Sequence, residues 1–121
     1  MSDRSFMMGG MSEEERRQWY AIGQVYLAVS DLVGQGDVRE RLVDAYMTHL
    51  LTLSPDDFPQ HLRNEYRGIR EALTWLPPEH PGQGKLRSTV SRMSEEEAVL
   101  LGQKLVAMLY YLAELGQEES G

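Results

Sequence analysis

Three histidines are the residues of this 121-residue chain best suited to metal or proton chemistry, because imidazole binds metal ions and titrates near neutral pH. They stand apart at His49, His61 and His80. A zinc or di-iron site on helices needs pairs such as Glu-x-x-His or His-Glu-x-x-His, and neither pattern occurs. Asp57 and His61 are four residues apart and could share a helical face, but one pair does not make a site. We therefore expect no metal ion.

Phosphate and nucleophile chemistry have no better support. Residues 82–85 are Gly-Gln-Gly-Lys, but a phosphate-binding loop also needs an earlier glycine and a Ser or Thr after the lysine. Glu79 and Leu86 occupy those two positions. The hydroxyls at positions 88, 89 and 91 have no neighbouring His and Asp pattern, and the chain has no cysteine. We expect no catalytic residue, no cofactor and no enzymatic activity.

The segment Met-Ser-Glu-Glu-Glu occurs twice, at residues 11–15 and 93–97. Its glutamates could do acid/base work only if burial shifted their pKa values, whereas the first turn of a helix is usually solvated. In both copies a serine precedes a glutamate by three positions, which is the pattern of a capping box at a helix start. The residues that follow share little beyond apolar phase, so we interpret the repeat as two independent helix starts.

Six basic side chains could form an anion-binding face. They are Arg63, Arg67 and Arg70, at helical spacing, and Lys85, Arg87 and Arg92 in the segment that follows. Such a face would suit phosphate or an acidic protein surface. The alternative is pairing within the chain, for example of Arg67 with Glu71 or of the row with the acidic helix starts. Few aromatic residues flank the basic segment, so the stacking platform of a single-strand binder is missing.

Four segments with apolar residues at alternating three and four spacing predict the helices that must position these side chains. They cover about residues 12–33, 37–53, 59–76 and 94–115, the last ending at Gly116. We expect an all-α, compact four-helix bundle-like domain over residues 11–117, with flexible tails at 1–10 and 118–121. The core stripe predicted for the first helix consists of Trp19, Ile22, Tyr26, Val29 and Val33.

The segment from residue 77 to 92 holds three of the five prolines and is the only long connection between these helices. We expect a long Pro/Gly-rich basic loop that lies across the helices, because long aperiodic connections are often functional or mobile. Within it Leu86, Ser88 and Val90 alternate as a short extended segment would.

Apolar residues in excess of one core face favour a protein partner. The helix at 94–115 is apolar around most of its circumference, and the helix at 12–33 has apolar residues beyond its stripe. Either the fourth helix is central, or part of this surface meets another chain. The residues proposed for such an interface are Tyr20, Leu27, Val106, Tyr110 and Tyr111.

The formal net charge of −7 is concentrated at the two ends of the chain, which argues against nonspecific binding to nucleic acid. No apolar run is long enough to cross a bilayer, and no signal peptide is visible, so we expect no membrane partner and a cytoplasmic location. The leading hypothesis is a small non-enzymatic interaction protein (an adaptor, inhibitor or accessory subunit) that self-associates, as a homodimer for example, through its first and fourth helices. The alternative is a helical subunit of a nucleoprotein complex that contacts phosphates through the basic face.

Overall fold

The computed structural model describes residues 10–120, with side chains through residue 114, and shows an all-helical chain. Its five α-helices are α2 (Glu13–Leu32), α3 (Val38–Ala45), α4 (Gln60–Thr74), α5 (Lys85–Ser91) and α6 (Glu95–Ser120). A π-helical turn, η1 (Tyr46–Leu50), and a 3-10 turn, η2 (Pro55–Asp57), lie between α3 and α4. The described residues contain no strand, so the predicted all-α class is confirmed. Residues 1–9 and 121, which belong to the two predicted tails, lie outside the described part.

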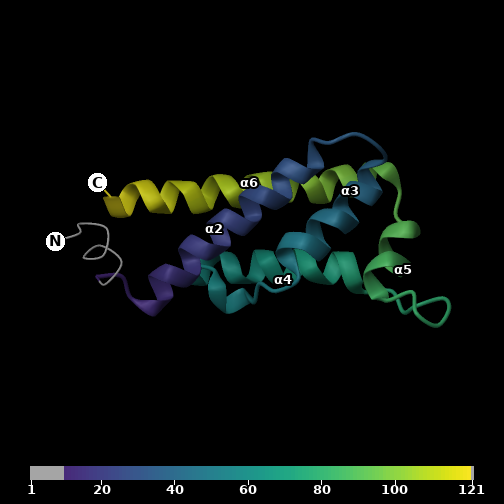
Figure 1. Cartoon of the computed structure of the whole chain (residues 1–121), viewed down its shortest axis with the longest axis horizontal. Helices are drawn as coiled ribbons and strands as arrows, with labels where there is room; N and C mark the ends of the chain where they lie inside the picture. The colour runs from purple at the N-terminus through teal and green to yellow at the C-terminus, as the bar shows by residue number, and fades with distance from the viewer. Residues whose placement is uncertain (1–9, 121) are drawn as a thin grey trace.

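Figure 1 shows α6 along the upper edge of the molecule and α4 along the lower edge, while α2 rises diagonally from the lower left and crosses α6. The helix α3 packs against both α2 and α6, and α5 lies at the C-terminal end of α4. Because the described residues form five α-helices, the predicted four-helix bundle is not confirmed. None of the described helices combines the length and the apolar character that spanning a lipid bilayer requires.

Both copies of Met-Ser-Glu-Glu-Glu start a helix, as predicted. The amide of Glu15 donates to Ser12 Oγ at 3.1 Å, and Ser12 N–H donates back to the Glu15 carboxylate at 3.1 Å. Ser94 and Glu97 repeat this exchange at the start of α6, at 3.1 and 3.3 Å. Each box satisfies two backbone N–H groups that a helix start leaves without partners, so the repeated sequence is local capping.

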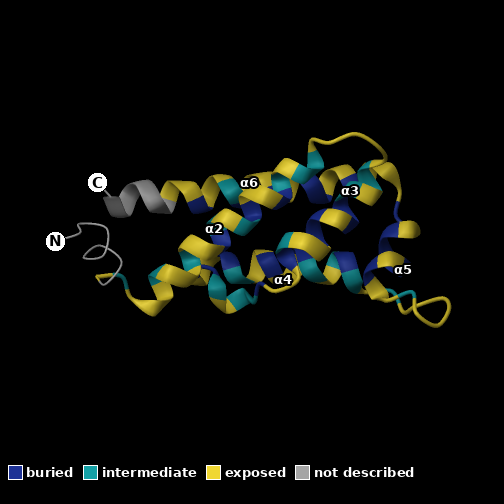
Figure 2. Ribbon diagram, viewed as in Figure 1, coloured by how far each residue is buried: buried dark blue, intermediate teal, exposed yellow. Residues whose placement is uncertain are grey.

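The core contains most of the apolar stripes predicted for the second, third and fourth helices (Figure 2), but Val38 and Leu76 of these stripes are only half-buried, and Leu115 lies beyond the described side chains. For α2 the predicted stripe is wrong in phase. Ala21, Val25 and Ala28 are fully buried, whereas Trp19 is 55% exposed and Tyr26 is 58% exposed. The two alanines carry no bulk beyond Cβ, which lets α2 lie close to its neighbours. The confirmed core residues are Leu42, Ala45, Tyr46, Leu50, Leu53, Leu62, Tyr66, Ile69, Leu73, Leu101, Leu105, Met108 and Leu112.

The loop predicted for residues 77–92 is in part a helix, and the extended segment predicted within it is wrong. After Gly84, which has a φ of 78°, the chain forms α5. Its hydroxyls hold it to the preceding connection, because Ser88 Oγ donates to the Pro77 carbonyl at 2.6 Å and Thr89 Oγ1 accepts from the Leu76 amide at 3.0 Å. These bonds form only in the folded chain, so local sequence pattern does not reveal them.

The predicted second helix is divided. The α-helix ends at Ala45, and the chain continues as the π-helical turn η1, in which Leu51 N–H donates to the Tyr46 carbonyl at 2.8 Å. The predicted end of the fourth helix also differs, because α6 continues past Gly116 to Ser120.

The α2–α3 connection is a short hairpin that Arg41 closes. Its guanidinium donates to the carbonyls of Leu32 and Gly34, the latter at 2.9 Å. A cation at this place also opposes the negative end of the α2 dipole.

Candidate functional site

The buried row of α6, from Ala98 through Leu112, separates two flanks of this helix that are both exposed and both rich in apolar residues. One flank faces α4, since Leu100, Lys104 and Tyr111 line cavities together with α4 residues. The other flank carries Val99 and Val106, which lie opposite Lys104 on the helix at 100° per residue. The candidate surfaces of the molecule lie on these two flanks.

The first surface combines the second flank of α6 with the exposed side of α2, and we name it the outer face. On α2 it contains the row predicted as core: Ile22 and Val29 pack partly against the core, while the larger aromatic residues of the row stay exposed. The two helices meet where Gly102 of α6 faces Leu32 of α2, since a Cβ built on Gly102 would lie 3.4 Å from Leu32 Cδ1. The outer face consists of Trp19, Ile22, Tyr26, Val29, Val33, Val99, Val106 and Tyr110.

The side of α2 on which this row lies follows from one polar pair. The His49 imidazole of η1 lies 3.0 Å from the Asp31 carboxylate, so η1 covers the Asp31 side of α2. Tyr20 and Leu27 precede Asp31 by eleven and four residues and therefore share its side. Tyr26 precedes Asp31 by five residues and therefore lies on a different side of α2, away from η1.

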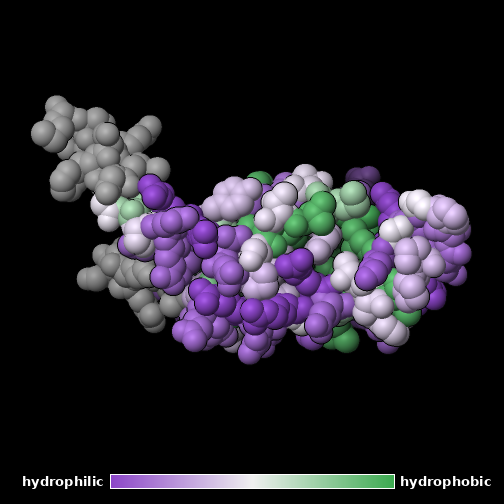
Figure 3. All heavy atoms as spheres, turned by 90° about the horizontal axis from the view of Figure 1, so that it is seen from below, coloured by the Kyte–Doolittle hydropathy of each residue, from purple (hydrophilic) through white to green (hydrophobic). Residues whose placement is uncertain are grey.

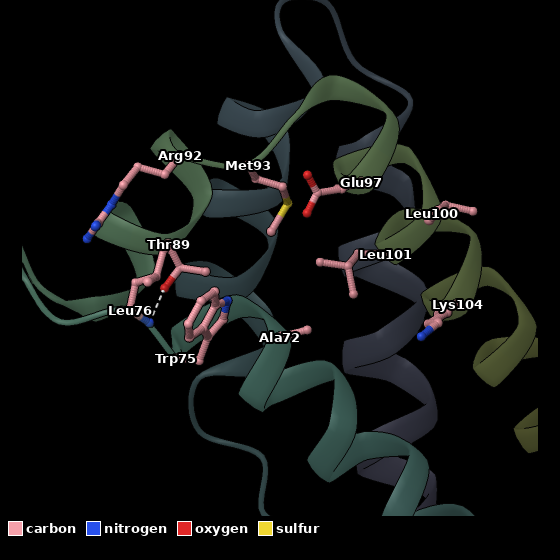
Figure 4. Close-up of a pocket in the computed structure, with 10 residues that line it drawn as sticks. All are labelled: Ala72, Trp75, Leu76, Thr89, Arg92, Met93, Glu97, Leu100, Leu101 and Lys104. Atoms are coloured by element: carbon pink, nitrogen blue, oxygen red, sulfur yellow. Dashed lines mark hydrogen bonds between the residues drawn. The ribbon is translucent and has the colours of Figure 1, made fainter.

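The second surface is a groove between α4 and α6, which we name the α4–α6 groove. One cavity of about 310 Å³ lies where the end of α4 meets α5 and the start of α6. Figure 4 shows Trp75 and Leu76 on one wall, with Met93 and Leu101 directed into the space between the walls. A second cavity of about 300 Å³ lies further along the same two helices, between His61 and Tyr111.

Charged groups occur at intervals along this groove. Lys104 lines both cavities and makes no salt bridge with the described side chains. The Arg92 guanidinium points away from the first cavity in Figure 4, because it donates to the Pro77 carbonyl at 2.8 Å and lies 3.7 Å from Glu79. Figure 3, drawn from the side on which α4 lies, shows hydrophilic residues over much of this face and apolar residues towards its middle.

The predicted basic face is not assembled around one cavity. Arg63 donates to the Phe58 carbonyl at 2.9 Å, Arg67 donates to Asn64 at 2.9 Å, and Arg70 lies 5.8 Å from the centre of the Tyr66 ring. Arg67 therefore bonds to Asn64 and not to the predicted partner Glu71. Arg87 lines a separate cavity against α3, and Lys85 begins α5. No cavity or polar contact of the described residues joins the α4 arginines to those of α5.

The five residues predicted for the interface are all exposed, but they lie on three surfaces. Val106 and Tyr110 belong to the outer face, and Tyr111 lines the α4–α6 groove. Tyr20 and Leu27 lie on the side of α2 that faces η1. The sequence pattern assigns the whole α2 row of the outer face to the core, although seven-residue spacing at 19, 26 and 33 could have indicated a second face. It counts Val99 and Leu100 among the surplus apolar residues of the fourth helix without placing them in the interface, and it does not indicate Lys104 or the α4 residues of the groove.

The titratable groups of the core and of the outer face are tyrosines. Burial raises the pKa of Tyr66, whose hydroxyl donates to the Leu50 carbonyl at 2.8 Å. The Glu114 carboxylate hydrogen-bonds to Tyr110 and raises the pKa of this phenol, which favours its neutral form. Asp57 is occupied in a capping box with Ser54. Within the described part of the chain no three His, Asp or Glu side chains gather as a metal site would require.

No protein-family model matches the chain, and neither a curated protein nor a solved structure matches it.

Proposed function

We propose that this chain is a small protein-interaction module that self-associates through the outer face of α2 and α6 and serves as an adaptor or accessory subunit. The observation that carries the proposal is the exposure of the large aromatic residues in a regular apolar row of α2, together with an exposed apolar row on α6. A row with a strict three-and-four repeat is the pattern by which helices pack on other helices. Here the chain's own helices leave that row open.

Leaving a row of apolar side chains exposed to water is unfavourable for a monomeric protein. Exposed single apolar residues are common on proteins, but a contiguous apolar patch usually marks an interface. The outer face supplies three large aromatic side chains, a residue type enriched at interface centres. An aromatic side chain also loses few rotamers when a partner covers it.

A second copy of the chain fits this face because none of its eight side chains carries a charge. In a two-fold dimer the same patch lies on both sides of the interface, so a patch without charged side chains buries no unpaired charge. Two crossed α2–α6 pairs laid against each other would form a four-helix packing shared between the copies.

The direct test compares two tyrosines that lie on different sides of α2. Tyr26→Asp should reduce the mass measured by light scattering from about twice the 13.8 kDa chain mass to the mass of one chain, because it buries a charge in the interface. Val106→Asp, on the other helix of the outer face, should do the same.

Tyr20→Asp is the matched control, since Tyr20 is 53% exposed on the same helix but lies on the η1 side. It should leave the mass unchanged. If the wild-type chain has the mass of one copy at concentrations near 100 μM, or if Tyr20→Asp and Tyr26→Asp act alike, the proposed self-association is wrong. Circular dichroism of each variant would show that the helices remain.

A further inference from the structure

The α4–α6 groove lies on the flank of α6 away from the outer face, so what it binds is independent of self-association. The groove is bordered by one row of residues on α4 and one on α6, each at alternating spacings of three and four. The two helices run in opposite directions. The α4 row consists of His61, Glu65, Gly68, Ala72 and Trp75, and the α6 row consists of Glu97, Leu100, Lys104, Ala107 and Tyr111.

Between the two ends of the groove the bordering residues are small. A Cβ built on Gly68 would meet nothing within 4 Å, and Ala72 and Ala107 have only a methyl group. At the two ends larger apolar side chains rise at the rim. Trp75 and Leu100 are exposed at one end, and Tyr111 is exposed at the other. Each end has its own cavity of about 300 Å³, so the groove offers two apolar sites with a narrower connection between them.

The charge at the centre of the groove is a single cation. Lys104 is the only Lys or Arg of α6, and it is the residue that lines both cavities. The other charges lie towards the ends. Glu97 accepts from the Ser94 amide, and Glu65 lines only the cavity that contains His61. A partner that fills the groove would therefore place an acidic group at its centre.

The distance between the two cavities matches a helix. Leu100 and Met108, which line one cavity each, are eight residues apart on α6, or about 12 Å at a rise of 1.5 Å per residue. On a helix that lies along the groove, side chains about seven residues apart span this distance on one face. An extended peptide would find no sheet edge to pair with, because residues 10–120 contain no strand.

We infer that the α4–α6 groove docks an amphipathic helix of a partner protein, in which one acidic side chain lies midway between two large apolar side chains about seven residues apart. The apolar side chains enter the two cavities, and the acidic side chain pairs with Lys104. The helical partner keeps its own backbone hydrogen bonds, so it can enter an apolar groove without leaving peptide groups unpaired.

The test is selection of binding peptides from a displayed library of random peptides of about 16 residues, with the full chain as bait. Enriched peptides should share an acidic residue midway between two large apolar residues. Binding of a synthesised winner should fall about tenfold or more for Lys104→Glu, since a like charge then faces the acid. Replacing the acid of the peptide by lysine should restore binding to the Lys104→Glu chain.

A steric variant separates the groove from the charge. Gly68→Trp fills the middle of the groove and should also lower the affinity for the peptide by about tenfold or more. Gly23→Trp is the matched control, because Gly23 is likewise an exposed helical glycine with nothing within 4 Å of a built Cβ, but on α2. It should leave binding unchanged, and thermal melting should show that both variants fold.

Three outcomes would overturn the inference. The library could yield no enriched peptide, the enriched peptides could bind the Lys104→Glu and Gly68→Trp chains as well as the wild type, or they could lack the central acid. A fall in the mass of the chain itself with Gly68→Trp would assign the groove to a second copy instead. The first three outcomes leave the outer face untouched, whereas a fall in mass with Gly68→Trp would also count against the outer face as the self-association surface; the tyrosine variants of α2 test that face separately.

Discussion

The two flanks of α6 are both exposed and both apolar, but they differ in shape and charge. The outer face is built from eight uncharged side chains on two crossing helices, with the Glu114 carboxylate beside Tyr110 at its edge, whereas the α4–α6 groove has small residues in its middle and a lysine at its centre. An uncharged, aromatic face suits an identical copy, and a groove with one central cation suits a different, acidic partner. One helix thereby presents two surfaces with different specificities.

The buried row between the two flanks holds the molecule together, and it should respond most strongly to truncation. Leu105 is 0% exposed and Leu100, on the rim of the groove, is 58% exposed. Leu105→Ala should lower the free energy of unfolding by about 3 kcal/mol through the cavity that it leaves, and Leu100→Ala by less than about 0.5 kcal/mol. Urea unfolding followed by circular dichroism measures both. Equal losses would mean that α6 is not divided into a core row and two open flanks.

Two glycines, Gly102 between α2 and α6 and Gly68 of α4 beside the groove, should respond to leucine with opposite signs. Gly102 is buried against Leu32, so Gly102→Leu forces α2 and α6 apart and should cost about 1–3 kcal/mol of unfolding free energy. Gly68 borders open space, so Gly68→Leu should stabilise α4 by about 0.5–1 kcal/mol through its better helix propensity. Thermal melting distinguishes the signs. A loss of stability with Gly68→Leu would show that the groove is closed.

The smallest expected effect concerns the phenol of Tyr110 on the outer face. Its hydrogen bond with Glu114 raises its pKa above the ordinary value of 10.0, so the neutral form persists to higher pH. Glu114→Gln should remove this shift and move part of the tyrosinate absorbance to lower pH. Tyr110→Phe, which deletes the phenol, identifies that part of the titration. If Glu114→Gln leaves the titration curve unchanged, Glu114 does not contact Tyr110 in solution.

The sequence predicts three of the four apolar stripes and both capping boxes, because those features depend on neighbours within one helix. It fails on α2, which carries two apolar rows of similar regularity. The row with Trp19 and Tyr26 has the bulkier side chains, but the row with Ala21 and Ala28 permits closer approach of other helices and is the one that is buried. Choosing between these rows requires the shapes of the partner helices, which a single-helix pattern does not contain.

The differences at α5 and η1 have the same origin. Ser88 and Thr89 of α5 are weak helix formers, and their buried hydroxyls find partners in the Leu76–Pro77 connection only after folding. In the π-helical turn η1 the Leu51 amide bonds to the carbonyl five residues earlier, at Tyr46, and no pattern of residue types in the sequence marks this change. The sequence indicates that α6 has more apolar residues than one core face needs. It does not indicate that α2 borders one exposed flank of α6 and α4 borders the other.

The most direct measurement is a dilution series of amide nuclear magnetic resonance spectra of the wild-type chain. If the outer face self-associates, amide signals of this face, including Tyr26 and Val106, should shift or broaden with concentration, and those of Gly68 and Lys104 in the groove should stay unchanged. Shifts confined to the groove, or spectra that are the same at all concentrations, would contradict the assignment of the outer face as the self-association surface.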